Sequence, residues 1–195
     1  MLRYFLRRVL EGVTSVVSPN KIYNELKSQG YRIGKNTLYE FLEAGEAIYL
    51  FQILKKYNPS VVKQELGEKK VYAIDTGLLN AISFAYSKDY GKLLENTCYL
   101  HWRRRGIPIF FHKDYRECDF IVQGQDGGML PVQVTASLAD RDTAKRELAG
   151  VVDACKRLGT GHGRIVTLGE QGMLQENGVS IEVLPAWRLL LEENA

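Results

Sequence analysis

Two carboxylates and two uncharged polar residues form the part of this chain best suited to chemistry. Glu95 falls in a stretch with helical periodicity, Asp119 in the strand-like run 116–123, and Gln133 and Thr135 in the strand-like run 130–137. Mg²⁺ prefers oxygen ligands, so Asp119 could bind one, with the Gln133 amide oxygen as a weaker ligand and Glu95 acting through a water. A hydrolytic metal site also needs a cation to orient the attacking water. Thr135 brings no charge, so these four residues predict a weakened catalytic site.

The same residues have a structural alternative. Glu95 and Asp119 could be polar residues of the fold, each capping a helix or pairing with an arginine, and the sequence leaves both interpretations open. None of the three histidines has metal-ligand spacing, and no Ser-His-Asp order stands out.

The residues around these positions predict a domain with the order α-β-β-β-α-β-β-α. Apolar periodicity indicates helices at 90–105, 143–158 and 187–192, and strands at 108–111, 118–122, 129–134, 164–168 and 180–184. The turn at 126–128 joins the second strand to the third. This order is typical of a restriction-endonuclease-like α/β domain, a mixed sheet flanked by helices.

Residues 1–75 predict a winged helix-turn-helix. Helices are expected at 2–14, at 20–29 after the N-cap Ser18 and Pro19, and in a third segment that begins with the capping box Thr37–Glu40 and ends at Gly45. Strands at 47–54 and 71–74 would form the wing. We therefore expect a first domain at 1–75, a connector at 76–90 with a short helix at 77–84, and a second domain at 91–195. The chain as a whole is expected to be α+β.

A winged helix most often binds DNA through its third helix and its wing. The candidate contacts are Lys35, Asn36 and Tyr39 on the third helix, Lys55, Lys56, Lys63, Lys69 and Lys70 on the wing, and Arg103, Arg104 and Arg105. Glu40 and Glu43 on the same helix oppose phosphate binding. The wing lysines could instead form a solvated loop, and the three arginines could end a helix, where cations suit the dipole.

Composition and charge narrow the class of protein. Residues 1–75 contain 12 Lys and Arg against 8 Asp and Glu, a balance of +4, so the remainder carries −1 of the total of +3. The three cysteines lie far apart, which predicts reduced thiols and neither a zinc site nor a disulfide framework. No apolar run is long enough to span a bilayer and the N-terminus is no signal peptide. We expect a cytoplasmic protein.

As an ordered set, several segments resemble the C-terminal region of a family of archaeal and bacterial AAA+ ATPases. In that family a P-loop ATPase module precedes a winged helix and a domain of unknown function with a PD-(D/E)XK nuclease-like fold. The resemblance covers nearly the whole chain and is carried by Ser18-Pro-Asn-Lys-Ile-Tyr-Asn-Glu-Leu, Asn36-Thr-Leu-Tyr-Glu-Phe-Leu-Glu-Ala-Gly-Glu-Ala, Lys70-Val-Tyr-Ala-Ile-Asp-Thr-Gly-Leu-Leu, Gly91-Lys-Leu-Leu-Glu-Asn, Glu117-Cys-Asp-Phe-Ile-Val, Val132-Gln-Val-Thr and Arg146-Glu-Leu.

The resemblance implies specific roles. Glu95, Asp119 and Gln133 match the family's acidic positions, whereas Thr135 stands where the family has lysine. The ATPase module is absent from these residues, so an ATPase would be a partner, in a longer chain or in trans. The near match to a phosphate loop at 30–36 is one residue short and lies outside a strand-to-helix context, which predicts no ATP hydrolysis.

Three functions follow as hypotheses. The favoured one is nucleic-acid or partner binding for an ATPase, with little or no catalysis. The second is a divergent Mg²⁺-dependent nuclease using Glu95, Asp119 and Gln133. The third is a protein-interaction or oligomerisation module that does not bind nucleic acid.

Overall fold

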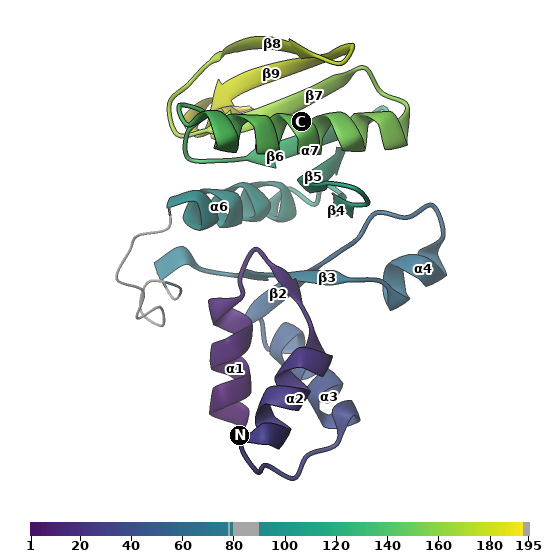
Figure 1. The fold of residues 1–195 in the computed structure, drawn as a ribbon, viewed down its shortest axis with the longest axis vertical. Helices are drawn as coiled ribbons and strands as arrows, with labels where there is room; N and C mark the ends of the chain where they lie inside the picture. Colours follow the sequence, from purple (N-terminus) through teal and green to yellow (C-terminus); the bar gives the residue numbers. More distant parts are fainter. Residues whose placement is uncertain (78, 80–89, 193–195) are drawn as a thin grey trace. The chain divides into compact units, whose positions relative to one another are not determined.

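The computed structural model describes residues 1–77, 79 and 90–192, which fall into two compact units (Figure 1). The first unit comprises Met1–Lys55 and Ser60–Lys88, and the second comprises Lys56–Pro59 and Asp89–Ala195. Lys56–Pro59 therefore belongs with the second unit, which the sequence pattern did not indicate. The helix expected at 77–84 lies almost entirely outside the described residues. Within those residues, no helix is long and apolar enough to cross a membrane.

The first unit combines helices with a small antiparallel sheet. Its elements are α1 (Leu2–Glu11), β1 (Val16–Val17), α2 (Pro19–Ser28), α3 (Lys35–Ala47), β2 (Phe51–Lys55), α4 (Val61–Leu66) and β3 (Lys69–Ala73). β3 is the central strand, with β1 and β2 antiparallel on either side. Phe5, Leu26 and Leu38, one from each long helix, are fully buried and form the centre of this unit's core. The stretch between the two predicted wing strands contains the short helix α4.

The helix boundaries of this unit confirm one prediction and correct two. The Ser18 side chain accepts a hydrogen bond from the Lys21 backbone N–H at 3.3 Å, with Pro19 in the first helical position. The predicted capping box at Thr37 is wrong, because α3 already begins at Lys35 with Gly34 as its N-cap. Gly45 does not end the helix. A Cβ there would lie 2.4 Å from the Phe51 ring, so glycine is required for close packing.

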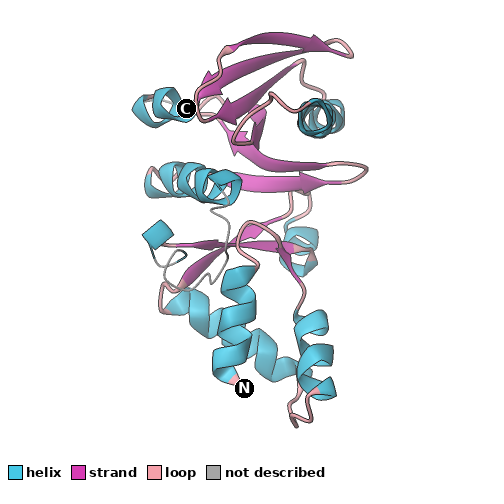
Figure 2. Ribbon diagram, turned by 60° about the vertical axis from the view of Figure 1, so that its left-hand side comes forward, coloured by secondary structure: helices cyan, strands magenta, loops and turns pink. Residues whose placement is uncertain are grey.

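The second unit is a mixed sheet flanked by helices, as predicted, but it has six strands where five were expected. Its elements are α6 (Tyr90–Arg104), β4 (Ile109–Lys113), β5 (Glu117–Gln123), β6 (Met129–Val134), α7 (Arg141–Leu158), β7 (His162–Thr167), β8 (Gly172–Glu176), β9 (Val179–Pro185) and α8 (Ala186–Leu191). The strand order is β4-β5-β6-β7-β9-β8, in which β6-β7 and β7-β9 are parallel and the other pairs antiparallel. α7 covers one face of the sheet, and α6 and α8 cover the other (Figure 2).

In the second unit, β8 is the strand that the sequence pattern missed, as it missed the two-residue β1 in the first unit. It forms a hairpin with β9 through Asn177 and Gly178, whose φ values of +50° and +80° fit a two-residue turn. The Asn-Gly pair is a strong hairpin signal. The strand itself was hard to recognise because all five residues of β8 are exposed. Its sequence therefore lacks the alternation of apolar and polar residues that marks a half-buried strand.

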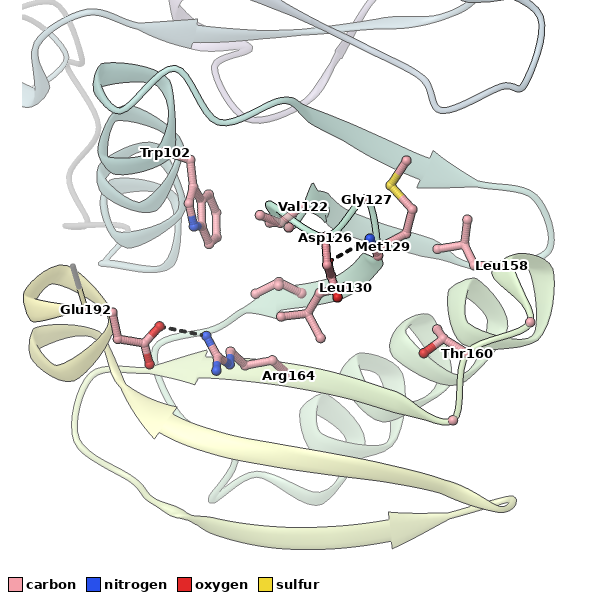
Figure 3. A pocket seen from close by; sticks show the side chains of 15 residues that line it. Trp102, Val122, Asp126, Gly127, Met129, Leu130, Leu158, Thr160, Arg164 and Glu192 are labelled. Atoms are coloured by element: carbon pink, nitrogen blue, oxygen red, sulfur yellow. Dashed lines mark hydrogen bonds and ion pairs between the residues drawn. The ribbon is translucent and has the colours of Figure 1, made fainter. Parts of the chain in front are cut away.

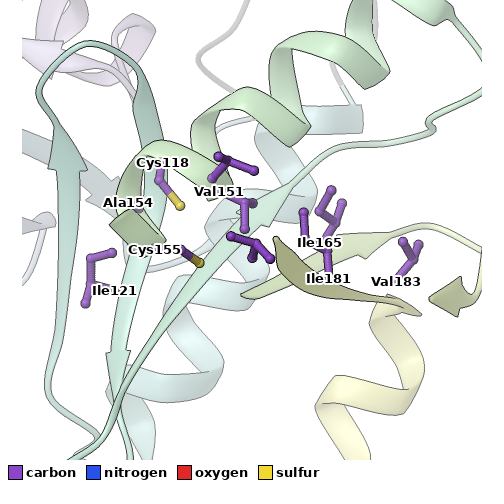
Figure 4. Close-up of a cluster of buried hydrophobic side chains, with 10 residues drawn as sticks. Cys118, Ile121, Val151, Ala154, Cys155, Ile165, Ile181 and Val183 are labelled. Atoms are coloured by element: carbon purple, nitrogen blue, oxygen red, sulfur yellow. The ribbon is translucent and has the colours of Figure 1, made fainter. Parts of the chain in front are cut away.

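α7 is the longest helix and packs over the main core of this unit. Asp140 caps its start by accepting a hydrogen bond from the Thr143 backbone N–H at 2.8 Å, and Gly159, with φ of +70°, ends it. This core joins apolar side chains of α7 to those of the sheet, and its fully or nearly buried members include Cys118, Ile121, Val151, Ala154, Cys155, Ile165, Ile181 and Val183 (Figure 4). On the other face, the Trp102 ring meets the Phe120 ring edge-on at 4.9 Å. The sheet is thus packed on both faces, which fixes β5 and β6 in register.

Candidate functional site

A cleft of about 510 Å³ in the second unit brings together all four residues singled out in the sequence. Glu95 comes from α6, Asp119 from β5, Gln133 from β6 and Thr135 from just beyond β6. Each is at most 8% exposed. The helix-strand-strand order thus predicted their convergence. The roles given to them are a separate question, which depends on how their polar atoms are used.

The Gln133 side chain joins β5 to α7 through two hydrogen bonds. Its Oε1 accepts from the Asp119 backbone N–H at 3.1 Å, and its Nε2 donates to Glu147 Oε2 at 2.6 Å. A backbone N–H can only donate and a carboxylate can only accept, so these partners also fix the orientation of the amide. Gln133 is therefore a bridge between two elements, held by both ends of its amide.

Asp119 is held from the neighbouring strand. Its Oδ2 accepts from the Val134 backbone N–H at 3.1 Å, while its own backbone N–H donates to Gln133. The two residues thus lock β5 to β6 at the cleft in addition to the strand pairing.

Glu147 of α7 is a member of the cleft that sequence reasoning missed. It is 4% exposed, and its Oε1 accepts from Arg146 Nε at 3.1 Å and Nη2 at 2.5 Å. Burial raises the pKa of the Glu147 carboxyl, and the nearby Asp119 carboxylate raises it further, against the opposing effects of Arg146 and Gln133. The signal was present in the sequence. Glu147 lies four residues before the buried Val151, and so on the inward face of α7.

Gly150 explains how α7 comes close enough for this contact. A Cβ at Gly150 would lie 2.3 Å from the Glu117 backbone oxygen, closer than any side chain allows. The absence of that carbon lets the helix backbone approach β5, and Glu147, one turn earlier, then reaches Gln133. The glycine and the buried acid belong to the same packing arrangement.

Charges in the cleft favour cations over phosphate. Glu95, Glu117, Asp119 and Glu147 line it together with Arg116 and Arg146, so four carboxylates face two guanidinium groups. Thr135 supplies no charge, and its hydroxyl donates to the Ser137 carbonyl at 3.4 Å. Arg146 is the cation that interacts most directly with the network, through Glu147.

The oxygen atoms of the cleft are the groups that could bind a metal ion. Within the described residues, no three His, Cys, Asp or Glu side chains are arranged to hold one. Asp119 Oδ2 and Gln133 Oε1, the two oxygens expected to bind Mg²⁺, each accept from a backbone N–H. These hydrogen bonds occupy one acceptor position on each oxygen, and Mg²⁺ at Asp119 stays a prediction.

Some of the candidate nucleic-acid contacts are exposed side chains, and others already contact a neighbouring residue. Lys35, Asn36 and Tyr39 are exposed on α3, with the Lys35 ammonium 5.4 Å from the centre of the Tyr23 ring. Arg103 and Arg104 are exposed at the end of α6, whereas Arg105 contacts His101. Burial, helped by Arg105, lowers the pKa of His101 to about 4.

The wing lysines are largely engaged with other groups. Lys55 pairs with Glu65 at 2.6 Å, Lys56 pairs with Asp114 at 3.2 Å, and Lys69 donates to the Glu65 carbonyl at 2.5 Å. Lys70 is fully buried on the central strand β3, which corrects its expected place at a nucleic-acid surface. Lys63 on α4 is exposed.

A second cavity of about 740 Å³ lies on the α6 side of the sheet, and none of the predicted site residues lines it (Figure 3). Its walls combine apolar side chains, including Trp102, Val122 and Leu130, with polar ones such as Asp126 and Thr160. Arg164 lies at one side, paired with Glu182 at 2.9 Å and Glu192 at 3.0 Å. The Arg164 charge is thus already matched by carboxylates, and we assign this cavity no ligand.

Comparison with known proteins gives relatives that are themselves uncharacterized. The chain is 28% identical over 196 residues to the uncharacterized protein MJ1544 of Methanocaldococcus jannaschii, a match that covers 94% of this chain and 43% of that protein. It is 26% identical over 159 residues to an uncharacterized protein of Haemophilus influenzae, covering 81% of this chain and 40% of that one. The chain thus spans about two-fifths of the length of these relatives. No family model and no solved structure matches it.

Proposed function

We propose that this chain is a winged helix followed by a nuclease-like domain that does not cleave phosphodiesters efficiently, and that it serves as a nucleic-acid-binding region for an AAA+ ATPase. The first unit supports the winged helix, since three helices and a hairpin of β2 and β3 are its components. The second unit supports the nuclease-like domain. It has a mixed sheet and a preceding helix that bring Glu95 and Asp119 to one cleft.

The observation that carries the proposal is the use of the Gln133 amide. Where a hydrolytic site would present a carboxylate to a metal, Gln133 connects the Asp119 backbone to the Glu147 side chain. Thr135 replaces the water-orienting cation with a hydroxyl. Loss of one such electrostatic group costs about a hundredfold in rate, so two losses leave little catalysis. The cleft is then a structural part of a binding domain.

Binding is assigned to α3 in preference to the wing. Lys35, Asn36 and Tyr39 lie on the exposed face of this helix, whereas Lys55, Lys56 and Lys69 are engaged in ion pairs or with carbonyls. Glu40 and Glu43 on α3 limit affinity for phosphates. We therefore expect weak, salt-sensitive binding. Association with an ATPase rests on the family resemblance, and more than half of each relative's length lies outside the match, which leaves room for such a module there.

One two-part experiment tests the proposal. Fluorescence anisotropy of a labelled DNA duplex, measured between about 50 and 200 mM salt, should show binding that weakens steeply with salt and is reduced by Lys35→Glu. Lys63→Glu, an equal charge change on the exposed part of α4, is the matched control and should have a smaller effect. Absence of binding, or binding insensitive to salt, would favour a protein-interaction module.

The second part is plasmid nicking in Mg²⁺ or Mn²⁺, in which we expect no cleavage above background. Metal-dependent cleavage is the alternative that one observation favours, since Glu147 and Arg146 bring a carboxylate and a cation to the same cleft. Cleavage by the unmodified chain that is lost in both Asp119→Ala and Glu147→Gln would replace our proposal with that enzyme.

A further inference from the structure

The two edges of the six-stranded sheet differ in how they are covered. At the β4 edge, the Tyr57 backbone N–H donates to the Phe111 carbonyl at 2.7 Å, and the Tyr57 ring meets the Phe110 ring at 5.7 Å. Lys56 adds a bridge to Phe111 and an ion pair with Asp114 at 3.2 Å. The chain itself therefore covers one edge. At the other edge, among the described residues, β8 pairs with β9 alone (Figure 1).

β8 has few of the features that usually protect an edge strand: it is five residues long and its single charged residue, Glu176, stands at its end. Its sequence, Gly172-Met-Leu-Gln-Glu176, contains no lysine, arginine or proline, the residues that commonly discourage pairing with another chain. Met173 is 64% exposed and Leu174 37% exposed. Their side chains project to opposite faces, as they alternate along a strand. An edge of this kind offers unpaired backbone groups together with apolar side chains on both faces.

We propose that two copies of this chain associate through β8, antiparallel and with a two-fold axis at Leu174. A two-fold contact uses the same patch on both copies, and two identical edge strands related in this way run antiparallel in one continuous sheet. Centring on Leu174 pairs all five residues: Leu174 faces Leu174 of the second copy, Met173 faces Gln175, and Gly172 faces Glu176. The contact joins the two sheets and leaves both clefts in place.

The charges of β8 and its flanks favour this register. With Leu174 at the axis, each Glu176 faces a glycine, so no carboxylate stands opposite another. Moving the axis to Met173 would place Glu176 opposite Glu170 of the second copy, and like charges directly opposite are destabilising. Parallel pairing in register would place Glu176 opposite Glu176. A second copy is therefore a partner whose charges suit this edge, and the full overlap selects one register.

The test is sedimentation velocity of the 195-residue chain over a range of concentrations. The wild type should show a concentration-dependent dimer, as expected for a contact made mainly by one strand from each copy. Leu174→Lys places two ammonium groups opposite each other. It should raise the dissociation constant of the dimer by about tenfold or more. Leu174→Glu should do the same. Leu168→Lys, an exposed leucine outside β8, should dimerise as the wild type does.

A mixture of the two charged variants, Leu174→Lys and Leu174→Glu, separates pairing at β8 from a general loss of structure. The introduced ammonium and the introduced carboxylate would face each other only in the mixed dimer. An equimolar mixture should therefore recover the association that each variant lacks alone. A wild type that stays monomeric, an undiminished dimer of Leu174→Lys, or a mixture that stays monomeric would each overturn the proposal. So would a β8 edge found paired with a strand of a different protein.

Discussion

At the scale of single residues, Gln133 determines the character of the cleft. Its amide donates to a carboxylate on α7 and accepts from the backbone of β5, so it needs both halves of the amide group. A glutamate at the same position keeps the accepting half and loses the donating one. The Gln133 amide thus supplies the hydrogen-bond donor that makes the buried Glu147 acceptable in the cleft.

Gln133→Glu should destabilise the fold because it removes the donor to Glu147. The new carboxylate would face Glu147 at the 2.6 Å contact now made by the amide, so the pKa of the pair would rise on folding. A raised acid pKa means that stability is retained below the unfolded value of about 4.3 and lost as pH increases above it. We expect a loss of about 2 kcal/mol in unfolding free energy at pH 7 and less at pH 5, measured by urea denaturation.

The reciprocal double variant provides the control. Gln133→Glu with Glu147→Gln restores one amide and one carboxylate at the same contact, and its stability at pH 7 should return towards that of the wild type. If Gln133→Glu alone is as stable as the wild type at pH 7, the bridge described here contributes nothing, and the cleft has room for the second charge.

At the scale of elements, the close approach of α7 to β5 positions the cleft. The helix backbone passes the Glu117 carbonyl at Gly150, where a Cβ would be only 2.3 Å away. Glycine lowers intrinsic helix stability, so its presence in the middle of an 18-residue helix has a cost that the packing offsets. The helix also carries Glu147 and Arg146, so its distance from the sheet sets the geometry of the network.

Gly150→Ala tests this packing. In an open helix the change would gain about 1 kcal/mol, but the clash with a backbone oxygen costs about 1–3 kcal/mol, and the oxygen cannot rotate away as a side chain can. We therefore expect a net loss of up to about 2 kcal/mol in unfolding free energy. Gly161→Ala, where a Cβ meets nothing within 4 Å, should be nearly neutral. Equal effects of the two changes would contradict the packing account.

At the scale of the whole molecule, the described residues contain two units with different chemical characters. The cleft of the second unit carries more carboxylates than guanidinium groups, whereas residues 1–75 as a whole carry a net charge of +4. Any phosphate-bearing partner is therefore expected at the first unit. This division is the reason for testing nucleic-acid binding and cleavage separately.

The chain is also predicted to lack ATP turnover of its own. Its near match to a phosphate loop, residues 30–36, follows the helix α2 and runs into the first turn of α3, whereas a phosphate loop joins a strand to a helix and carries Lys-Ser or Lys-Thr. Steady-state phosphate release by the purified chain should equal background, and Lys35→Ala should change nothing. Turnover that disappears in Lys35→Ala would show that this loop binds nucleotide after all.

Patterns along the chain were enough to predict most of the elements and the convergence of four residues. Helical and strand periodicities placed α6, β5, β6 and α7 within a few residues, because the burial of one face is written locally in the spacing of apolar side chains. Glu95, Asp119, Gln133 and Thr135 could then be assigned to one cleft, since consecutive elements usually lie side by side. The mixed sheet flanked by helices followed from the same order.

What those residues contact could be learned only from the packed fold. Several features depend on segments that are distant in the chain. These are the Gln133 bridge between Asp119 and Glu147, the burial of Lys70, and the cover that Lys56 and Tyr57 give to the β4 edge. The position of β8 at the other edge, paired with β9 alone among the described residues, is a further one. Local periodicity records how exposed a position is. It does not record which partner, far away in the sequence, supplies the other half of a hydrogen bond or the space for a glycine, because that is set by how the elements pack.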